Sequence, residues 1–394
     1  MREGRGLAIG FTLVVFGSAA ASLPRNADPS SVRPVAQPLA PVTIGALTRP
    51  DPATMPRGTI VGWGRNDYGQ ATPPSAEADF VAVAGRVTSS LALRADGSLV
   101  AWPSSIVATP NTGFVAVAAG SNHYLALKDD GSIIGWNGYA QFDAPPPNEG
   151  FVAVDAGSDH SVALKEDGSI VAWGSNLRRQ LEVPLPNTDF VAIAAGSYHN
   201  LAVKADGTIV AWGSNQYGAI TVPLPDAGFV AVAAGGDPTG GQSVGLKADG
   251  TVAAWGDTVF EQGWPPNPNG RFREIACGDY HNLALTQTGA IVVWGAGSKY
   301  VGFPNYGQDV VPTPKTGFIA IAGGGQHSLA IRRLPGDFEA DGYVDLHDAV
   351  EFLLRFDGPG IRPEQDDWHI FDWDTDTDVD LADFAFVQNG FTGD

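Results

Sequence analysis

Short apolar runs of five or six residues recur along the chain between positions 57 and 334, separated by glycine-rich turns. One copy comprises Phe190–Gly196, His199–Lys204 and Thr208–Gly213, with apolar residues on both faces of each run. Such runs are typical of strands in a sheet that is covered on both sides. Each copy therefore predicts three β-strands, and the many alanines leave room for the next sheet to approach.

An Asp-Gly dipeptide separates the second and third runs, as in Asp130-Gly131 and Asp206-Gly207. It favours a tight hairpin, because both residues tolerate the positive φ angles that such a turn requires. A tryptophan follows each turn glycine after five residues. These tryptophans are Trp63, Trp102, Trp136, Trp173, Trp212, Trp255 and Trp294, at a spacing of 34 to 43 residues. Repeats of this length are typical of propellers and solenoids.

The two ends of the repeat array favour a closed ring. The first copy has only a third strand, Thr59–Trp63, whereas the last has only the first two, Phe318–Ala322 and His327–Ile331. Joining them completes a seventh unit and removes the exposed sheet edges. The sequence therefore predicts an all-β, seven-bladed propeller over 57–334, with three- to four-stranded antiparallel blades closed by the N- and C-terminal strands.

The alternation of strand direction predicts two different ends of the propeller. All Asp-Gly turns lie at one end, and the first-to-second loops and the loops after each tryptophan lie at the other. These second loops vary in length and carry aromatic residues and arginine, which are enriched at binding hot spots. The candidate binding mouth consists of Tyr68, Arg178, Tyr198, Tyr217, Phe260, Tyr280, Tyr300 and Tyr306. The alternative is that they are ordinary loop residues, some packed against neighbouring blades.

Five histidines occupy one slot of the repeat: His123, His160, His199, His281 and His327. Blade symmetry spreads this slot around a ring that is too wide for ligands about 2 Å from one metal ion. We therefore expect structural histidines that bond a neighbouring turn. The single cysteine, Cys277, replaces an alanine of other copies and is expected to be a small buried side chain. No pattern of catalytic residues stands out, so no catalytic residue is assigned.

The N-terminus has the pattern of a secretory signal. Residues 1–22 contain Arg2 and Arg5, an apolar run from Leu7 to Phe16 and small residues before the expected cleavage site. The alternative, a transmembrane anchor, requires about 18 or more apolar residues. We expect export to the extracellular space, cell surface or periplasm, with no membrane span after cleavage. Residues 23–56, rich in proline and alanine, are expected to form a linker.

The formal net charge of -20 is concentrated in the C-terminal tail. Residues 336–394 contain 17 acidic residues and two arginines, whereas the rest of the chain has a net charge of -5. The repeat region therefore lacks the basic surface of a nucleic-acid-binding protein.

Two acidic segments of the tail have the oxygen spacing of calcium loops. The first places side chains at loop positions 1, 3, 5, 9 and 12 and a carbonyl at position 7, with Gly342 at the sharp turn. Hard Ca²⁺ requires six to eight oxygens, supplied in this order by an EF-hand loop. The predicted ligands of two Ca²⁺ ions are Asp337, Glu339, Asp341, Tyr343, Asp345 and Asp348, and Asp372, Asp374, Asp376, Asp378, Asp380 and Asp383. The alternative is an acidic tail that only aids solubility.

Copies such as Ala195–Asn215 resemble the regulator of chromosome condensation type of repeat, over roughly Arg57 to Arg332. Their short length is similar to that of the secreted β-lactamase inhibitor propeller, whose blades are three-stranded. The nuclear relatives' GTPase exchange and chromatin binding are poor expectations for an exported chain without a basic tail.

The paired acidic loops resemble a dockerin module, a small α-helical EF-hand-like domain expected over 336–394. That resemblance implies a cohesin-like or cell-surface partner. The partner is expected to contact the helix starts at Leu346, His347, Leu381 and Ala382.

These patterns together favour a secreted, non-catalytic propeller that binds a protein or other macromolecule and is tethered by its calcium-dependent tail. Two alternatives remain open at this point. One is a protein inhibitor of an exported enzyme such as a β-lactamase, and the other is a propeller enzyme acting on polysaccharide.

Overall fold

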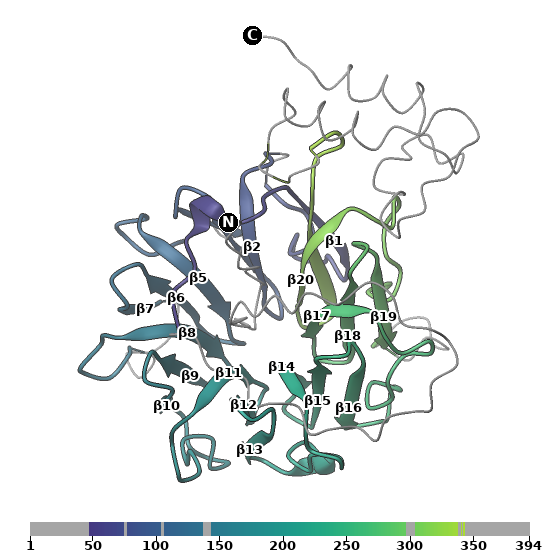
Figure 1. Cartoon of the computed structure of the whole chain (residues 1–394). Helices are drawn as coiled ribbons and strands as arrows, with labels where there is room; N and C mark the ends of the chain where they lie inside the picture. The colour runs from purple at the N-terminus through teal and green to yellow at the C-terminus, as the bar shows by residue number, and fades with distance from the viewer. Residues whose placement is uncertain are drawn as a thin grey trace, which may run out of the picture.

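A computed structural model of the chain describes residues 47–74, 77–103, 106–136, 143–296, 304–337, 340 and 342. Within them, seven three-stranded antiparallel sheets surround a common axis (Figure 1). The blades, in order, are blade 1, β2 (Phe80–Gly85), β3 (Ser90–Arg94) and β4 (Leu99–Trp102); blade 2, β5 (Phe114–Ala119), β6 (Tyr124–Lys128) and β7 (Ile133–Trp136); blade 3, β8 (Phe151–Ala156), β9 (His160–Lys165) and β10 (Ile170–Gly174); blade 4, β11 (Phe190–Ala195), β12 (His199–Lys204) and β13 (Ile209–Gly213); blade 5, β14 (Phe229–Asp237), β15 (Gly240–Lys247) and β16 (Val252–Gly256); blade 6, β17 (Phe272–Cys277), β18 (His281–Thr286) and β19 (Ile291–Gly295); and blade 7, β20 (Phe318–Gly323), β21 (His327–Arg332) and β1 (Thr59–Gly64). The predicted seven-bladed propeller is confirmed.

Blade 7 closes the ring with strands from both ends of the repeat region. Strand β1 pairs with β21 from Thr59 opposite Arg332 to Gly64 opposite His327, and β21 pairs with β20. This is the shared blade that the incomplete first and last copies predict.

The repeated Asp-Gly sequence forms the expected turn between the second and third strands. In blade 4, the Asp206 carboxylate accepts hydrogen bonds from the backbone N–H and the hydroxyl of Thr208, and Gly207 has a φ of 81°. The lysine before the turn lies over the phenylalanine that begins the blade, with 4.1 Å between Lys204 Nζ and the Phe190 ring centroid. The repeated lysine therefore contributes a cation–π contact to the scaffold.

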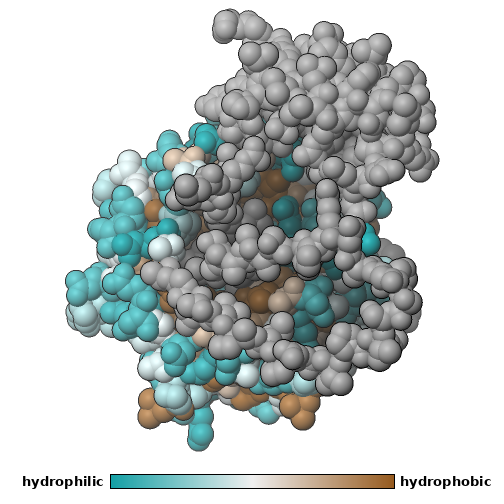
Figure 2. All heavy atoms as spheres, viewed as in Figure 1, coloured by the Kyte–Doolittle hydropathy of each residue, from teal (hydrophilic) through white to brown (hydrophobic). Residues whose placement is uncertain are grey.

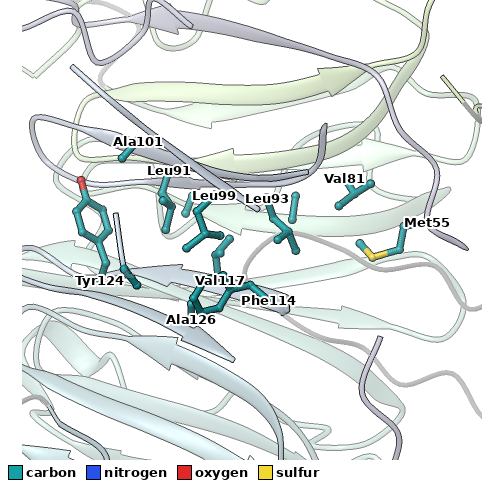
Figure 3. Packing of buried hydrophobic residues seen from close by; sticks show 13 residues of the cluster. Met55, Val81, Leu91, Leu93, Leu99, Ala101, Phe114, Val117, Tyr124 and Ala126 are labelled. Atoms are coloured by element: carbon teal, nitrogen blue, oxygen red, sulfur yellow. The ribbon is translucent and has the colours of Figure 1, made fainter. Parts of the chain in front are cut away.

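Adjacent blades pack face to face through apolar side chains. Figure 3 shows Leu91 and Leu93 of blade 1 beside Val117 and Phe114 of blade 2, with both leucines fully buried. Burial of one such side chain contributes about 1.5–3 kcal/mol. Hydrophilic residues cover much of the outer surface, and hydrophobic atoms show between them nearer the axis (Figure 2).

Residues 47–56 do not form a linker, in contrast to the expectation for 23–56. Leu47 is buried in a cluster with Val152 and Phe190, and Met55 packs against Val81 and Phe114. A short 3-10 helix, η1 (Pro52–Thr54), lies between them and is capped by the Asp51 side chain. The proline-rich sequence around Leu47 and Met55 has no regular apolar pattern that would predict their burial. The rest of the expected linker lies outside the described residues.

Candidate functional site

The ring has two chemically different ends. In blade 4, β11 and β13 both finish at the loop end, which we define by the turns after first and third strands. The hairpin end is defined by the Asp-Gly turns. This arrangement confirms the predicted alternation of strand direction and identifies the variable loops as those of the loop end.

The five repeated histidines connect blades 2, 3, 4, 6 and 7 to the blade that follows each of them. Their Nε2 atoms form hydrogen bonds of 2.8 to 3.0 Å with a serine or asparagine of the following blade, as in His199 to Ser243 and His160 to Asn200. Because Ser243 Oγ donates to the carbonyl of Ala219, His199 must donate its Nε2 proton. His327 makes the same contact with Ser90 and so links blade 7 to blade 1.

These histidines are held in the neutral form. Burial lowers the pKa to about 3 for His281 and His327 and to about 4 for His160 and His199. Protonation would add an Nδ1–H donor, and Nδ1 of His281 has no hydrogen-bond partner among the described residues. A Cβ on Gly278 would collide with the His281 ring, so glycine is required beside it. The prediction of structural histidines is supported by these contacts.

The repeated tryptophans fix the turn that precedes their own blade. The Trp212 indole N–H donates to the Gln180 carbonyl at 2.8 Å, and the Asn200 side chain donates to the same oxygen. The Gln180 side chain accepts from the backbone N–H of Arg178. We call the five turns of this type the rim turns: residues 66–70, 176–180, 215–219, 258–262 and 304–308. A fixed scaffold therefore holds each rim turn at the loop end.

Five of the eight predicted mouth residues occupy the third position of a rim turn. Tyr68 and Tyr217 are 58% and 56% exposed, Tyr306 is 38% exposed, Arg178 is exposed and Phe260 is half-buried. We call this third position the rim slot. The rim slot holds tyrosine in three turns, arginine in one and phenylalanine in one. Turn 215–219 differs from the other four, because Ala219 replaces the glutamine and Tyr217 has a φ of 58°.

Of the remaining mouth residues, Tyr198 is half-buried and Tyr280 is buried, whereas Tyr300 lies outside the described residues. Tyr280 packs edge-on against Phe260 and donates its hydroxyl to the Asp237 carboxylate. Burial by itself would raise the pKa of Asp237, but the hydrogen bonds from Tyr280 and Thr239 outweigh it and lower the pKa. Tyr280 therefore supports the long β14–β15 turn instead of lining a mouth.

An arginine that the sequence patterns did not single out joins two rim slots. The guanidinium of Arg65 lies 5.1 Å from the Tyr306 ring centroid and donates to Asp67 and Gln326. Interaction with Asp67 is the main cause that raises its pKa, and Tyr68 also contributes. The half-buried Arg65 therefore pairs with Tyr306, and Asp67 links it to the rim turn that carries Tyr68.

The seven first-to-second turns are joined around the axis at the loop end. Arg86 donates to the carbonyl of Ser121, and Ser121 donates to that of Gly157. The other junctions are closed by contacts of Ser158 with Ser197, Ser197 with Gly236, Gly236 with Gly278, Asp279 with Gly325 and Gly325 with Arg86. The ring surrounds a cavity of about 80 Å³ that is partly open to solvent and also contacts Asp155 and Cys277. The loop end is consequently linked by a continuous ring of contacts near the axis and variable at its rim.

Two buried carboxyl groups bridge the inner strands of neighbouring blades. Asp155 accepts from the backbone N–H of Ala195, and Glu274 accepts from that of Ile321. Burial raises the pKa of Asp155 to about 7 and that of Glu274 to about 8. Cys277, which was expected to be buried, is half-buried beside the cavity. Desolvation, followed by the nearby Asp155, raises the pKa of its thiol, which disfavours the reactive thiolate.

Only the start of the predicted calcium tail lies within the described residues. Asp337 is buried and accepts the backbone N–H of Gly342 at 2.8 Å, and Gly342 has a φ of 88°. These features fit positions 1 and 6 of an EF-hand loop. Ala340 is buried among blade 7 residues, and its carbonyl accepts the Arg57 N–H. The other predicted ligands, the second loop, the helices, the partner contacts and the signal segment lie outside the described residues.

Within the described residues, no helix is long and apolar enough to cross a membrane. The same part of the chain has no group of three histidine, cysteine or acidic side chains placed to hold a metal ion.

The repeats and the fold are both found in known proteins. The family model of the regulator of chromosome condensation (RCC1) repeat matches residues 114–136, 151–180, 190–219 and 272–300, which begin at the first strands of blades 2, 3, 4 and 6. No curated protein matches the chain.

Solved structures share the propeller at low identity. Prp20p from Saccharomyces cerevisiae, described with its binding to Gsp1p and histones, is 19% identical with a TM-score of 0.57 over 73% of this chain and 93% of its own. Yeast RCC1 (Prp20) in a complex with Kap60 is 17% identical with a TM-score of 0.58, over 79% and 98%. Human WBSCR16 is 18% identical with a TM-score of 0.52, over 70% and 98%.

Such identities establish the fold alone. Together with the matched repeats and the seven closed sheets, they show that the chain is a seven-bladed β-propeller built from repeats of the RCC1 type.

Proposed function

We propose that this chain is an exported, non-catalytic propeller that binds a protein through the rim slots of its loop end. The observation that carries the proposal is the exposed tyrosine or arginine that recurs at the same position of the rim turns. Tyr68, Arg178, Tyr217 and Tyr306 occupy equivalent positions, and all four are exposed. Rigid aromatic residues provide contact area at low entropic cost, and aromatic residues and arginine are enriched at protein–protein hot spots.

Propellers of the same fold offer a precedent for protein binding. Prp20p binds Gsp1p and histones, and yeast RCC1 was solved with Kap60 bound. The locked histidine and tryptophan contacts favour the same use here, because a preorganised surface loses little conformational entropy on binding.

A capture experiment with the full chain tests the rim. Material from the producing culture is passed over the immobilised wild type and the Tyr68→Ala/Tyr306→Ala variant. The matched control is Leu224→Ala, which removes a 90% exposed apolar side chain on the connection between β13 and β14. We expect a bound protein that the double variant loses and the control retains. Equal capture by all three proteins would contradict the rim assignment.

The same rim variants separate binding from inhibition. A panel of exported enzymes that includes β-lactamases and wall-building transpeptidases is assayed with wild type and double variant. Inhibition that depends on Tyr68 and Tyr306 would identify the binding propeller as an inhibitor.

The tail is proposed to bind two Ca²⁺ ions and to tether the propeller to a cohesin-like or cell-surface partner. The Asp337–Gly342 bond supports the first loop, and the repeated spacing supports the second. Calorimetry of the chelator-treated full chain is expected to detect two calcium sites, with one lost in Asp345→Ala and the other in Asp380→Ala. Absence of calcium-specific heat in the wild type would refute this part of the proposal.

A further inference from the structure

Seven equivalent residues surround the axis at the loop end, one from each blade. They follow the glycine at the end of each first strand: Arg86, Ser121, Ser158, Ser197, Gly236, Asp279 and Gly325. Five of them are small, whereas Arg86 and Asp279 carry charges. These two belong to blades 1 and 6, which flank blade 7.

The Arg86 side chain makes its contacts with blade 2. Its Nη2 donates to the Ser121 carbonyl at 2.6 Å, and its guanidinium lies 4.7 Å from the Tyr124 ring centroid. The hydroxyl of Tyr124 is itself bonded to Ser89. This arrangement explains why the arginine does not neutralise the carboxylate on the other side of blade 7.

The carboxylate of Asp279 lines the axial cavity without a partner. Its backbone N–H donates to Gly325, but its side chain has no hydrogen bond or ion pair within the described residues. A Cβ on Gly325 would lie 3.0 Å from Asp279 Oδ2, so the glycine leaves room for the carboxylate. Burial, followed by the nearby Asp237, raises the Asp279 pKa to about 8. An acidic group in this state gains most from a cation brought to it.

The size of the cavity restricts what can enter. Pockets for metabolites and cofactors typically measure about 300–1,000 Å³, whereas this cavity measures about 80 Å³. It accepts the end of one side chain. The backbone carbonyls that join the loops each have a second lone pair, so they offer additional acceptors to a compact donor.

We propose that this axial cavity takes the ammonium group of a lysine side chain from the partner protein, with the Asp279 carboxylate as its counter-ion. An ammonium group is compact and has three donors, which suits one carboxylate and neighbouring carbonyls. The guanidinium group of arginine is larger and planar, so it suits this cavity less well. The inference rests on the proposed function, because it places a central contact within the rim that holds the same partner.

The test uses n-butylammonium chloride as a mimic of the lysine side chain and the full chain as the receptor. Calorimetric titration at constant ionic strength is expected to show saturable binding of one probe per chain. Asp279→Asn keeps the shape of the side chain and removes the charge, and it is expected to weaken binding by about tenfold or more. Asp159→Asn is the matched control, because Asp159 lies in the equivalent turn of blade 3 but does not line the cavity. It is expected to leave the affinity unchanged.

Two further measurements probe the charge and the shape of the site. The affinity is expected to rise about tenfold between pH 6 and 7 and about fivefold between pH 7 and 8, because the carboxyl group must lose its proton before it pairs with the probe. Gly325→Ala narrows the space beside Asp279 Oδ2 and is expected to weaken binding as well.

Three results would overturn the proposal: no saturable binding, equal affinity in Asp279→Asn, or complete displacement of the probe by millimolar CaCl₂, which would indicate an inorganic cation site. The titration needs no protein partner, so its failure leaves the rim proposal standing. If the wild type captured no protein at all, that result would instead refute the rim proposal and would not affect the titration.

Discussion

The two ends of the propeller are built from the same seven repeats and yet differ in what is fixed. At the hairpin end, Asp-Gly turns recur with the same side-chain bonds, and lysine or arginine lies over phenylalanine in six blades. At the loop end, the backbone contacts recur but the presented side chains change. Tyr68, Arg178 and Tyr217 occupy one slot there.

The difference shows how a repeat protein separates stability from recognition. A rim turn is held through its backbone, by Trp212 on a carbonyl and by the Gln180 side chain on an N–H. Neither contact involves the rim-slot side chain, so that residue is free to vary without loss of the blade. Function on repeat scaffolds is accordingly expected where the backbone is fixed and the side chain is not.

The largest expected effect acts through pH on the histidine contacts that five of the blades make. Unfolded histidines take up protons below pH 6.5, but the five buried ones do not, since their pKa values are lowered to about 3 or 4. Acidification therefore favours the unfolded chain. Three carboxyl groups with pKa values raised to about 7 or 8 act in the opposite direction, because they gain protons in the folded state first.

Unfolded histidines are only half protonated at pH 6.5, so the difference approaches two protons only near pH 5. A loss of about 5 kcal/mol in the free energy of unfolding is therefore expected between pH 6.5 and 4. Urea denaturation of the full chain at pH 8, 6.5 and 4 measures it. A free energy of unfolding that does not change between pH 6.5 and 4 would show that the histidine contacts do not hold the blades together as inferred.

Loss of a single tryptophan contact is expected to have the next largest effect on the free energy of unfolding. Trp212→Ala removes a buried ring and its bond to Gln180, and it is expected to lower the free energy of unfolding by about 3–5 kcal/mol. Trp212→Phe retains most of the packing and loses only the N–H, so we expect about 1–3 kcal/mol. Thermal or urea denaturation compares both with the wild type. A negligible effect of Trp212→Phe would assign the stabilisation to packing alone, whereas equal effects of the two substitutions would assign it to the indole N–H bond.

The smallest expected effect on stability belongs to the rim slot. Tyr68→Ala is expected to change the free energy of unfolding by about 0.5 kcal/mol or less, because the side chain is exposed. The same substitution is expected to weaken partner binding by about 2 kcal/mol, as a hot-spot residue would. If Tyr68→Ala destabilised the fold as strongly as Trp212→Phe, the two ends would not differ as described.

The fold was accessible to sequence reasoning because its determinants are local and repeated. Asp206-Gly207, the apolar runs and the incomplete first and last copies predict the hairpins, the strands and the closed ring. The anchors Leu47 and Met55 were missed, since each buries a side chain against blades that are distant in sequence.

The site was only partly predictable. Rim residues such as Tyr68 and Tyr306 stood out by type and loop position, but the same criterion also selected Tyr280, which is only 8% exposed. Asp279 gave a weaker signal, a charged residue where other copies have serine or glycine. Within the described residues, the Asp279 side chain has no partner because the Arg86 side chain contacts blade 2 instead. The sequence of a single repeat does not predict that orientation.

The shared construction of blade 7 sets the order in which a newly made chain can complete its ring. Strand β1 leaves the ribosome first and has no sheet partner until β20 and β21 follow, more than two hundred residues later. The six internal blades each contain their own strands, so they can form during synthesis. The bonds from Trp63 to Gln308 and from His327 to Ser90 are then the last to be made. A chain whose synthesis stops before β20 would therefore keep an open ring and an unpaired β1.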